Sequence, residues 1–258
     1  TFDRGGSVII PAFAVGRTQE LLYAIREIKQ KKLVRGHDGF PVYLDSPLAE
    51  EATAVFLQCD PDFFDEPTRE LLRQGVNPIW FPNLHLAPAV EQSRAINDDP
   101  RPKIILSASG MCDAGRIRHH LKHNLWKPEN LVLLAGYQAN GTLGRSLQEG
   151  VKTVRLFGEE VAVRAEIAML HGASGHADQA GLLRWVGAIA PKPQFVFVNH
   201  GDEENCEAFR DLLTKEGYTA FAPYSGTVFD VAAGRLDYVA EPRRIEKTGS
   251  ARKKEVYT

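Results

Sequence analysis

Short apolar runs alternate with amphipathic stretches along most of this chain, and this alternation constrains the fold more than any other feature. The apolar runs have the length of buried strands. The stretches between them repeat apolar residues at helical spacing, as Leu21, Leu22, Ile25 and Ile28 do within residues 17–31. Strands that alternate with helices form a mostly parallel sheet covered by helices. The sequence therefore predicts an α/β fold.

The alternation also places the individual elements. The expected strands are residues 7–10, 42–44, 104–106, 131–134, 195–198 and 227–231. The expected helices are residues 17–31, 48–57, 63–72, 178–189 and 203–215. Residues 154–157 and 161–167 both alternate in polarity around Gly158-Glu159, which predicts a hairpin.

Two glycine-bearing turns, Gly110-Met111 and Gly141-Thr142, directly follow two of the apolar runs. Each is expected to open a helix, where backbone N–H groups carry partial positive charge and bind phosphate. One such turn indicates little, because glycine also serves ordinary turns. Two turns on neighbouring strands, with Ser109 beside the first, predict a track for a chain of phosphates.

Three further blocks follow or precede these turns. They are SGHAD at residues 174–178, VNHGD at residues 198–202 and RGGSVIIPAFAVGRTQE at residues 4–20. In their order along the chain, these blocks and the two glycine turns resemble the β-CASP branch of the metallo-β-lactamase superfamily. That branch includes ribonuclease J and the nuclease of the pre-mRNA cleavage and polyadenylation factor. The resemblance covers nearly all of residues 4–231. The sequence contains no His-x-His-x-Asp-His run, which supplies most metal ligands in that family.

The resemblance implies two regions. Residues 1–162 would form a β-CASP domain that clamps RNA, and residues 163–240 the C-terminal portion of a metallo-β-lactamase fold. The Lys and Arg residues near the C-terminus predict a basic tail at residues 241–258. The chain starts without an initiator Met and runs at once into a strand, so we expect a fragment whose partner is the missing N-terminal part of the lactamase domain.

His200 follows the apolar run 195–198 and precedes three acidic residues. A single histidine there is more often a helix cap than a metal ligand, because metal sites need several groups. The resemblance implies that His200 is the last histidine ligand of a two-zinc site. It also implies that His176 is the catalytic histidine that gives a proton to the leaving oxygen. Asp178 is placed to cap the next helix and also to orient this imidazole. A histidine that only stabilises its loop is the alternative.

Other residues are candidates for contacts to RNA. The guanidinium fork of Arg17 matches phosphate geometry, and Ser46 follows the strand at residues 42–44. Asp45 is expected to serve structure or RNA positioning. Tyr137 and Trp80 are candidates for stacking on bases, although such aromatic side chains more often fill cores.

Residues 116–123 are the most cationic segment of the body. Helical spacing puts two of its imidazoles on one face, but no carboxylate-bearing metal motif accompanies them. A solvated or RNA-facing surface is expected, and a plain polar helix face stays an alternative. The residues concerned are Arg116, Arg118, His119, His120, Lys122 and His123.

Bulk composition limits the partners. A net charge of −2 means that RNA contacts must be local. The three cysteines are widely spaced, which fits a reducing cytosol and predicts a cytoplasmic location. No apolar run reaches the length of a membrane span.

Together these features predict the closing part of a zinc-dependent ribonuclease that uses two metal ions on single-stranded RNA. The fragment alone would retain His176 and His200, bind zinc weakly or not at all, and cut no RNA, since even a catalytic zinc needs three protein ligands. A homodimer is an open alternative. A non-catalytic RNA-binding scaffold and an enzyme for a small phosphorylated metabolite are the competing functions.

Overall fold

The computed structural model describes residues 1–172 and 176–242. It contains two compact units, unit 1 (Thr1–Ser174) and unit 2 (Gly175–Thr258). None of the helices in the described ranges is long and apolar enough to cross a membrane.

Unit 1 is built on a six-stranded parallel sheet with the strand order β3-β2-β4-β1-β5-β8. The strands are β1 (Val8–Pro11), β2 (Val42–Leu44), β3 (Leu84–Leu86), β4 (Ile104–Ser107), β5 (Leu131–Leu134) and β8 (Glu166–Met169). The predicted α/β class is confirmed.

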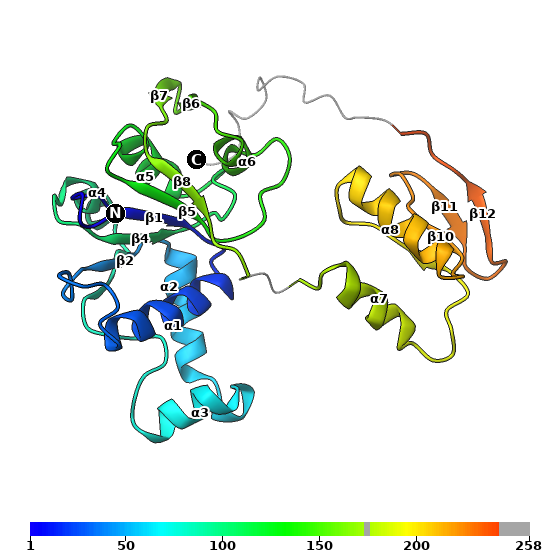
Figure 1. Cartoon of the computed structure of the whole chain (residues 1–258), viewed down its shortest axis with the longest axis horizontal. Helices are drawn as coiled ribbons and strands as arrows, with labels where there is room; N and C mark the ends of the chain where they lie inside the picture. Colours follow the sequence, from blue (N-terminus) through cyan, green and yellow to red (C-terminus); the bar gives the residue numbers. More distant parts are fainter. Residues whose placement is uncertain (173–175, 243–258) are drawn as a thin grey trace. The chain divides into compact units, whose positions relative to one another are not determined.

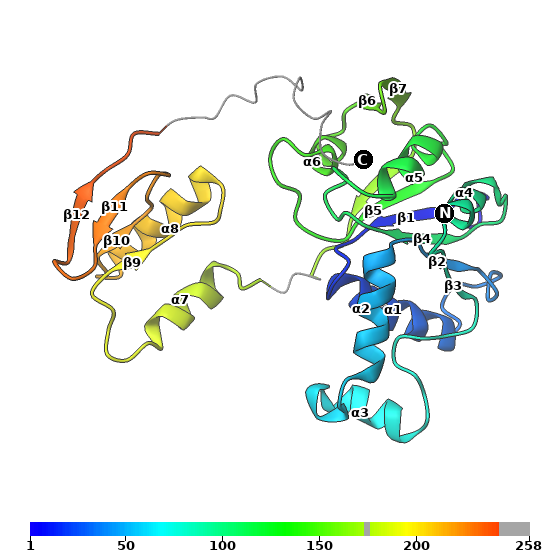
Figure 2. The ribbon, with the colours of Figure 1, turned by 180° about the vertical axis from the view of Figure 1, so that it is seen from behind.

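Helices cover both faces of this sheet. Figures 1 and 2 show α1 and α2 on one side and α5 and α6 on the other. The helices of unit 1 are α1 (Arg17–Gln30), α2 (Pro47–Gln58), the 3-10 helix η1 (Pro61–Phe63), α3 (Glu66–Arg73), α4 (Val90–Asp98), α5 (Ile117–Asn124) and α6 (Leu143–Gln148).

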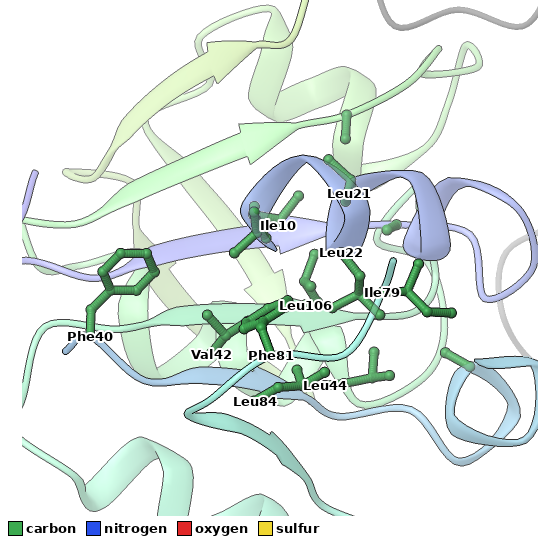
Figure 3. Packing of buried hydrophobic residues seen from close by; sticks show 14 of the residues in the cluster. Ile10, Leu21, Leu22, Phe40, Val42, Leu44, Ile79, Phe81, Leu84 and Leu106 are labelled. Carbon is green, nitrogen blue, oxygen red and sulfur yellow. The ribbon is translucent and has the colours of Figure 1, made fainter. Parts of the chain in front are cut away.

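One face of the sheet packs against α1 and α2. Ile10 of β1 and Leu106 of β4 lie in one buried cluster with Leu21 and Leu22 of α1 (Figure 3). Leu22 and Leu106 are fully buried. The helical spacing seen in the sequence therefore corresponds to the face of α1 that lies on the sheet.

The opposite face packs against α4, α5 and α6. Ile9 and Ile105 belong to a second buried cluster, which includes Ile117 and Leu121 of α5. Each of these strand residues directly precedes a residue of the first cluster, because successive side chains in a strand point to opposite faces. Cover on both faces explains why the strands are continuous apolar runs.

The region after α6 differs from the prediction. The hairpin is formed by β6 (Thr153–Leu156) and β7 (Glu159–Ala162) alone. The second half of the expected strand 161–167 contributes instead to β8, which pairs in parallel with β5. Strand β8 therefore belongs to unit 1. The expected end of the β-CASP region at residue 162 stays a prediction.

Within its described residues, 176–242, unit 2 contains two helices and two small two-stranded sheets. The helices are α7 (Gln179–Gly187) and α8 (Glu203–Lys215). Strands β9 (Val196–Phe197) and β10 (Ala220–Phe221) pair in parallel, and β11 (Val228–Asp230) and β12 (Arg235–Tyr238) pair antiparallel. Four phenylalanine rings pack together between these strands, namely Phe195, Phe197, Phe221 and Phe229.

Candidate functional site

The carboxyl ends of β1, β4 and β5 form one edge of the unit 1 sheet. These strands are parallel neighbours, so the loops that follow them meet at this edge. The loops are residues 12–16, 108–116 and 135–142. Open α/β sheets keep their functional groups at this edge. The two glycine turns follow β4 and β5, which are not neighbouring strands as predicted, because β1 lies between them.

Backbone hydrogen bonds join the loops after β4 and β5. The N–H of Gly144 donates to the carbonyl of Met111 at 3.0 Å. The N–H of Leu143 donates to Oδ1 of Asp113 at 2.9 Å. Both donors lie at the start of α6, so that helix is fixed to the loop after β4.

Gln138 joins the same two loops through its side chain. Its Nε2 donates to the carbonyls of Gly110 and Gly136, each at 3.0 Å. The side chain is almost fully buried, and a Cβ on Gly144 would lie 1.7 Å from its Oε1. Only glycine leaves room for this amide. Neither Gln138 nor Asp113 was predicted from the sequence, because their contacts depend on how the loops meet.

The two glycine turns differ in local structure. Thr142 is the N-cap of α6, and its Oγ1 accepts from the N–H of Arg145 at 3.2 Å. Gly141 has φ of +78°, which suits glycine. The prediction that Gly141-Thr142 opens a helix is therefore confirmed. For Gly110-Met111 the same prediction is wrong, because α5 begins only at Ile117.

The loop after β4 makes its own turn before α5 begins. The N–H of Ser109 donates to the carbonyl of Ala114 at 3.1 Å, and Ser109 Oγ accepts from the N–H of Ala114 at 3.3 Å. Gly115 closes this turn with φ of +78°, and a Cβ there would lie 2.4 Å from the carbonyl oxygen of Ala108. The predicted phosphate residues Ser109, Gly110 and Met111 therefore belong to a compact loop.

The two remaining candidates for phosphate contacts have partners within the protein. Ser46 is buried and caps α2, since its Oγ accepts from the N–H of Ala49 at 3.4 Å. Arg17 opens α1 and pairs with Glu20, with 17% of its side chain exposed. Arg17 follows the loop after β1, at the carboxyl edge of the sheet. The roles of both residues in binding phosphate stay predictions.

A buried charge network lies beneath this edge, centred on Asp45. The carboxylate is fully buried and accepts from Nη1 of Arg116 at 2.7 Å, from Oγ of Ser93 at 2.5 Å and from Nε2 of His120 at 2.5 Å. Burial alone would raise the pKa of Asp45. Hydrogen bonds from His120, Ser93 and Arg116 outweigh it and hold that pKa below its ordinary value.

Arg116 and His120 extend this network to neighbouring segments. Arg116 also donates to the carbonyls of Ala87 and Pro88, and the second ring nitrogen of His120 lies 3.0 Å from Oδ1 of Asn97. Of the two roles expected for Asp45, these contacts support the structural one, and RNA positioning stays a prediction. The expectation of a solvated or RNA-facing side chain is wrong for His120, which is fully buried.

Three other cationic side chains of α5 contact the β6–β7 hairpin. His119 stacks on Phe157 with ring centroids 4.3 Å apart, and the Arg118 guanidinium lies 4.9 Å from the same ring. Lys122 pairs with Glu159 at 2.6 Å. Burial lowers the pKa of His119 and His123, and neighbouring cations add to this effect. Arg118, His119 and Lys122 of α5 are therefore engaged in contacts within unit 1.

In unit 2, His200 lines a cavity of about 560 Å³. His200 has φ of +62°, a conformation uncommon outside glycine and found most often at turns and functional sites. The hydroxyl of Tyr224, on the same cavity, lies 2.7 Å from Oε1 of Glu203 and 3.0 Å from Oε1 of Glu207. These two carboxylates raise the pKa of Tyr224 to about 12.

The donor set around His200 does not complete a zinc site. Within residues 1–172 and 176–242, no three histidine, cysteine or acidic side chains are placed to hold one metal ion. A catalytic zinc takes three protein ligands, so these residues do not fit a zinc ion by themselves. His200 stays a predicted single ligand.

His176 and Asp178 lie at the start of α7. Oδ1 of Asp178 accepts from the N–H of Gly181 at 2.7 Å, which confirms Asp178 as the helix cap. His176 is exposed and is not among the described residues that line the His200 cavity. Residues 174 and 175 of the same motif lie outside the described residues. The role of His176 as the proton donor stays a prediction.

Two family models match the chain. The Beta-Casp domain matches residues 18–147, and the Zn-dependent metallo-hydrolase RNA specificity domain matches residues 160–223.

Curated relatives match much of the chain. Ribonuclease TTHA0252 from Thermus thermophilus is 39% identical over 219 residues, which cover 84% of this chain and 48% of the relative. Transcription termination factor FttA from Methanosarcina mazei is 36% identical over 212 residues, covering 80% and 32%. FttA from Pyrococcus horikoshii is 34% identical over 230 residues, covering 86% and 34%. The chain thus spans half or less of the length of these relatives.

Proposed function

Because this chain belongs to the β-CASP ribonuclease family, we propose that it is the RNA-binding and part of the catalytic region of a zinc-dependent ribonuclease. Unit 1 would bind single-stranded RNA at the carboxyl edge of its sheet. Unit 2 would contribute His176 as the proton donor and His200 as one metal ligand. The other ligands would come from the part of the relatives that this chain does not match.

The cross-linked loops of unit 1 carry this proposal. Hydrogen bonds through Gln138, Gly144 and Leu143 hold the loops after β4 and β5 together. Arg17 lies at the same edge of the sheet. Loops fixed in this way would bind a phosphate chain at little cost in conformational entropy. The small net charge favours such a local site over a uniformly basic surface.

The proposed chemistry is hydrolysis of a phosphodiester. Water attacks phosphorus in line, one P–O bond breaks, and the leaving oxygen gains a proton. We assign that proton to His176. Proton transfer from a positioned side chain contributes about 10²–10⁴-fold to a rate, so His176→Ala in the full-length protein should lower RNA cleavage by about that factor. Zinc content, measured by atomic absorption, should stay unchanged. Cleavage at the wild-type rate would refute the assignment.

RNA binding is tested on this chain alone. Filter binding should show that it binds single-stranded RNA more tightly than a mononucleotide, because only the longer ligand reaches several phosphate contacts. Its affinity should fall steeply between two salt concentrations. Equal affinity for the mononucleotide would favour an enzyme of small phosphorylated metabolites.

The names of the archaeal relatives favour a second candidate. They are called transcription termination factors, so a non-catalytic RNA-binding module acting in termination is the alternative. The two candidates make different predictions for the full-length protein. The ribonuclease should contain zinc and cleave RNA, whereas the module should bind RNA without cleaving it. This chain alone is expected to cleave no RNA under either candidate.

A further inference from the structure

Phe13 displays an aromatic ring at the carboxyl edge of the unit 1 sheet. The residue follows β1, and 47% of it is exposed. Its backbone is held firmly, because the carbonyl of Phe13 accepts from Oγ1 of Thr18 at 2.7 Å and from the N–H of Thr18 at 3.3 Å. On the other side, the N–H of Ala12 donates to the carbonyl of Ser107 at 3.0 Å.

The rest of this loop is held by the buried side chain of Gln19. Its Oε1 accepts from the N–H of Gly16 at 2.7 Å, and its Nε2 donates to the carbonyl of Ala14 at 3.2 Å and to Oγ1 of Thr53 at 2.9 Å. A buried amide with these partners fixes the path of the loop. The exposure of Phe13 is therefore a property of an ordered segment.

The Phe13 ring lies against the first glycine turn. A Cβ on Gly110 would be 3.1 Å from Cδ2 and 3.2 Å from Cε2 of Phe13. The carbonyl of Gly110 in turn accepts from Gln138. Tyr137, next to Gln138 in the chain, is 52% exposed. Phe13 and the residue next to Tyr137 thus both lie against Gly110, the residue expected to approach a phosphate chain.

We propose that Phe13 and Tyr137 are stacking platforms for bases of single-stranded RNA whose phosphates lie along the glycine loops. This inference rests on the proposed function and adds a site for the bases. An aromatic ring stacks on the flat face of any base, so the site would add affinity with little sequence preference. An apolar ring held at a phosphate-binding edge suits a ligand that alternates charged phosphates with flat bases.

The test compares intact and abasic RNA. Fluorescence anisotropy would measure the Kd of this chain for a labelled oligouridylate and for an oligomer of equal length without bases. Phe13→Ala should weaken binding of the intact RNA about ten- to hundred-fold and leave the abasic oligomer unchanged. Phe13→Trp should keep the wild-type Kd, because it keeps a stacking face. Tyr137→Ala should act as Phe13→Ala does.

Val15→Ala is the matched control. Val15 lies in the same loop and is 60% exposed, but it has no aromatic face, so its loss should leave both Kd values unchanged. Circular dichroism checks that each variant folds. Phe13→Ala should also keep the salt dependence of binding, whereas Arg17→Gln should reduce the slope of log K against log salt by about 0.7.

The outcomes separate this inference from the proposed function. If Phe13→Ala weakens the binding of intact and abasic RNA equally, the stacking role is wrong. It is also wrong if Val15→Ala weakens the binding of intact RNA as much as Phe13→Ala does. If the chain binds RNA but Phe13→Ala changes nothing, the stacking role is wrong and the proposed function stands. If the chain binds no RNA at all, both are wrong.

Discussion

Units 1 and 2 differ in how much apolar packing supports the residues that the proposed function uses. In unit 1, the loops at the carboxyl edge follow strands that are buried on both faces. In unit 2, the buried hydrophobic residues among those described are Val186, Leu213 and Ala240. Trp185 and Val231 of unit 2 are exposed by 66% and 85%. The loops proposed to bind RNA therefore belong to unit 1, which has the larger set of buried apolar residues.

This difference in packing predicts that unfolding affects the two histidines of the proposed catalytic site before it affects the RNA-binding loops. His176 and His200 are both exposed and lie in unit 2. Local stability follows the density of buried apolar contacts. We therefore expect unit 2 to unfold at a lower denaturant concentration than unit 1. RNA binding should then persist at denaturant concentrations that abolish any function that needs the two histidines.

The largest effect is expected from Asp45→Ala in unit 1. This change leaves Arg116 and His120 without their shared carboxylate inside the protein. Breaking a buried ion pair by removing one partner costs about 3–5 kcal/mol, so the free energy of unfolding of unit 1 should fall by that amount. Urea unfolding followed by circular dichroism measures it. Asp3→Ala is the control, because Asp3 is exposed and pairs with His37 at the surface.

The same variant carries a pH dependence. The pKa of Asp45 is lower in the folded protein than its ordinary value, so its contribution to stability is complete above the unfolded pKa of about 3.9. The contribution is lost as the pH falls through the folded pKa. The difference in unfolding free energy between wild type and Asp45→Ala should thus shrink as the pH falls below about 4. A constant difference would show that the carboxylate charge does not matter.

The Asp45 network also shows what the sequence could not predict. Asp45 and His120 lie 75 residues apart, and their contact depends on how α5 packs against the sheet. Helical spacing correctly predicted a helix with two imidazoles on one face, but it does not say which face is buried. His120 therefore looked solvated. A charged residue directly after a buried strand, as Asp45 is, was the available signal.

The elements themselves were more predictable. The apolar runs at residues 7–10, 104–106 and 131–134 became β1, β4 and β5, because strands covered on both faces must be continuously apolar. Polarity alternates across residues 161–167, which predicted one hairpin strand. In the structure, this stretch is divided between two strands. The hairpin strand β7 ends at Ala162, and pairing with β5 sets the position of β8. Such long-range pairing leaves no local signal.

The next effect compares one leucine from each unit. Leu213 of α8 and Leu121 of α5 are both fully buried. Each leucine-to-alanine change should cost about 2–5 kcal/mol. Leu213→Ala should lower only the unfolding midpoint of unit 2, and Leu121→Ala only that of unit 1. Trp185 fluorescence reports on unit 2, and Trp80 and Trp126 report on unit 1, so single-tryptophan versions of the chain separate the transitions.

The comparison of the two units would fail under one clear result. If both variants shift one common transition by the same amount, the chain unfolds as a single cooperative body. The lighter packing of unit 2 would then have no separate effect on stability. Two transitions in the reverse order would contradict the expectation that unit 2 is the weaker unit.

The smallest effect concerns the contact between Gly144 and Gln138 in unit 1. Gly144→Ala inside a helix normally raises stability by about 1 kcal/mol. Here the added Cβ would lie 1.7 Å from Oε1 of Gln138 and 3.1 Å from the carbonyl oxygen of Met111. We expect a loss of about 1–3 kcal/mol instead, because the amide must leave its place in a packed interior. Urea unfolding of unit 1 gives the sign.

A double-mutant cycle identifies the cause of that loss. In a Gln138→Ala background the clash with Oε1 is gone, so Gly144→Ala should become neutral or stabilising. An unchanged loss would place the strain at the Met111 carbonyl instead. Both single variants should also weaken binding of single-stranded RNA, because Gln138 holds the loop after β5 to Gly110. If stability falls while RNA affinity stays at the wild-type value, the joined loops support the fold of unit 1 without positioning RNA.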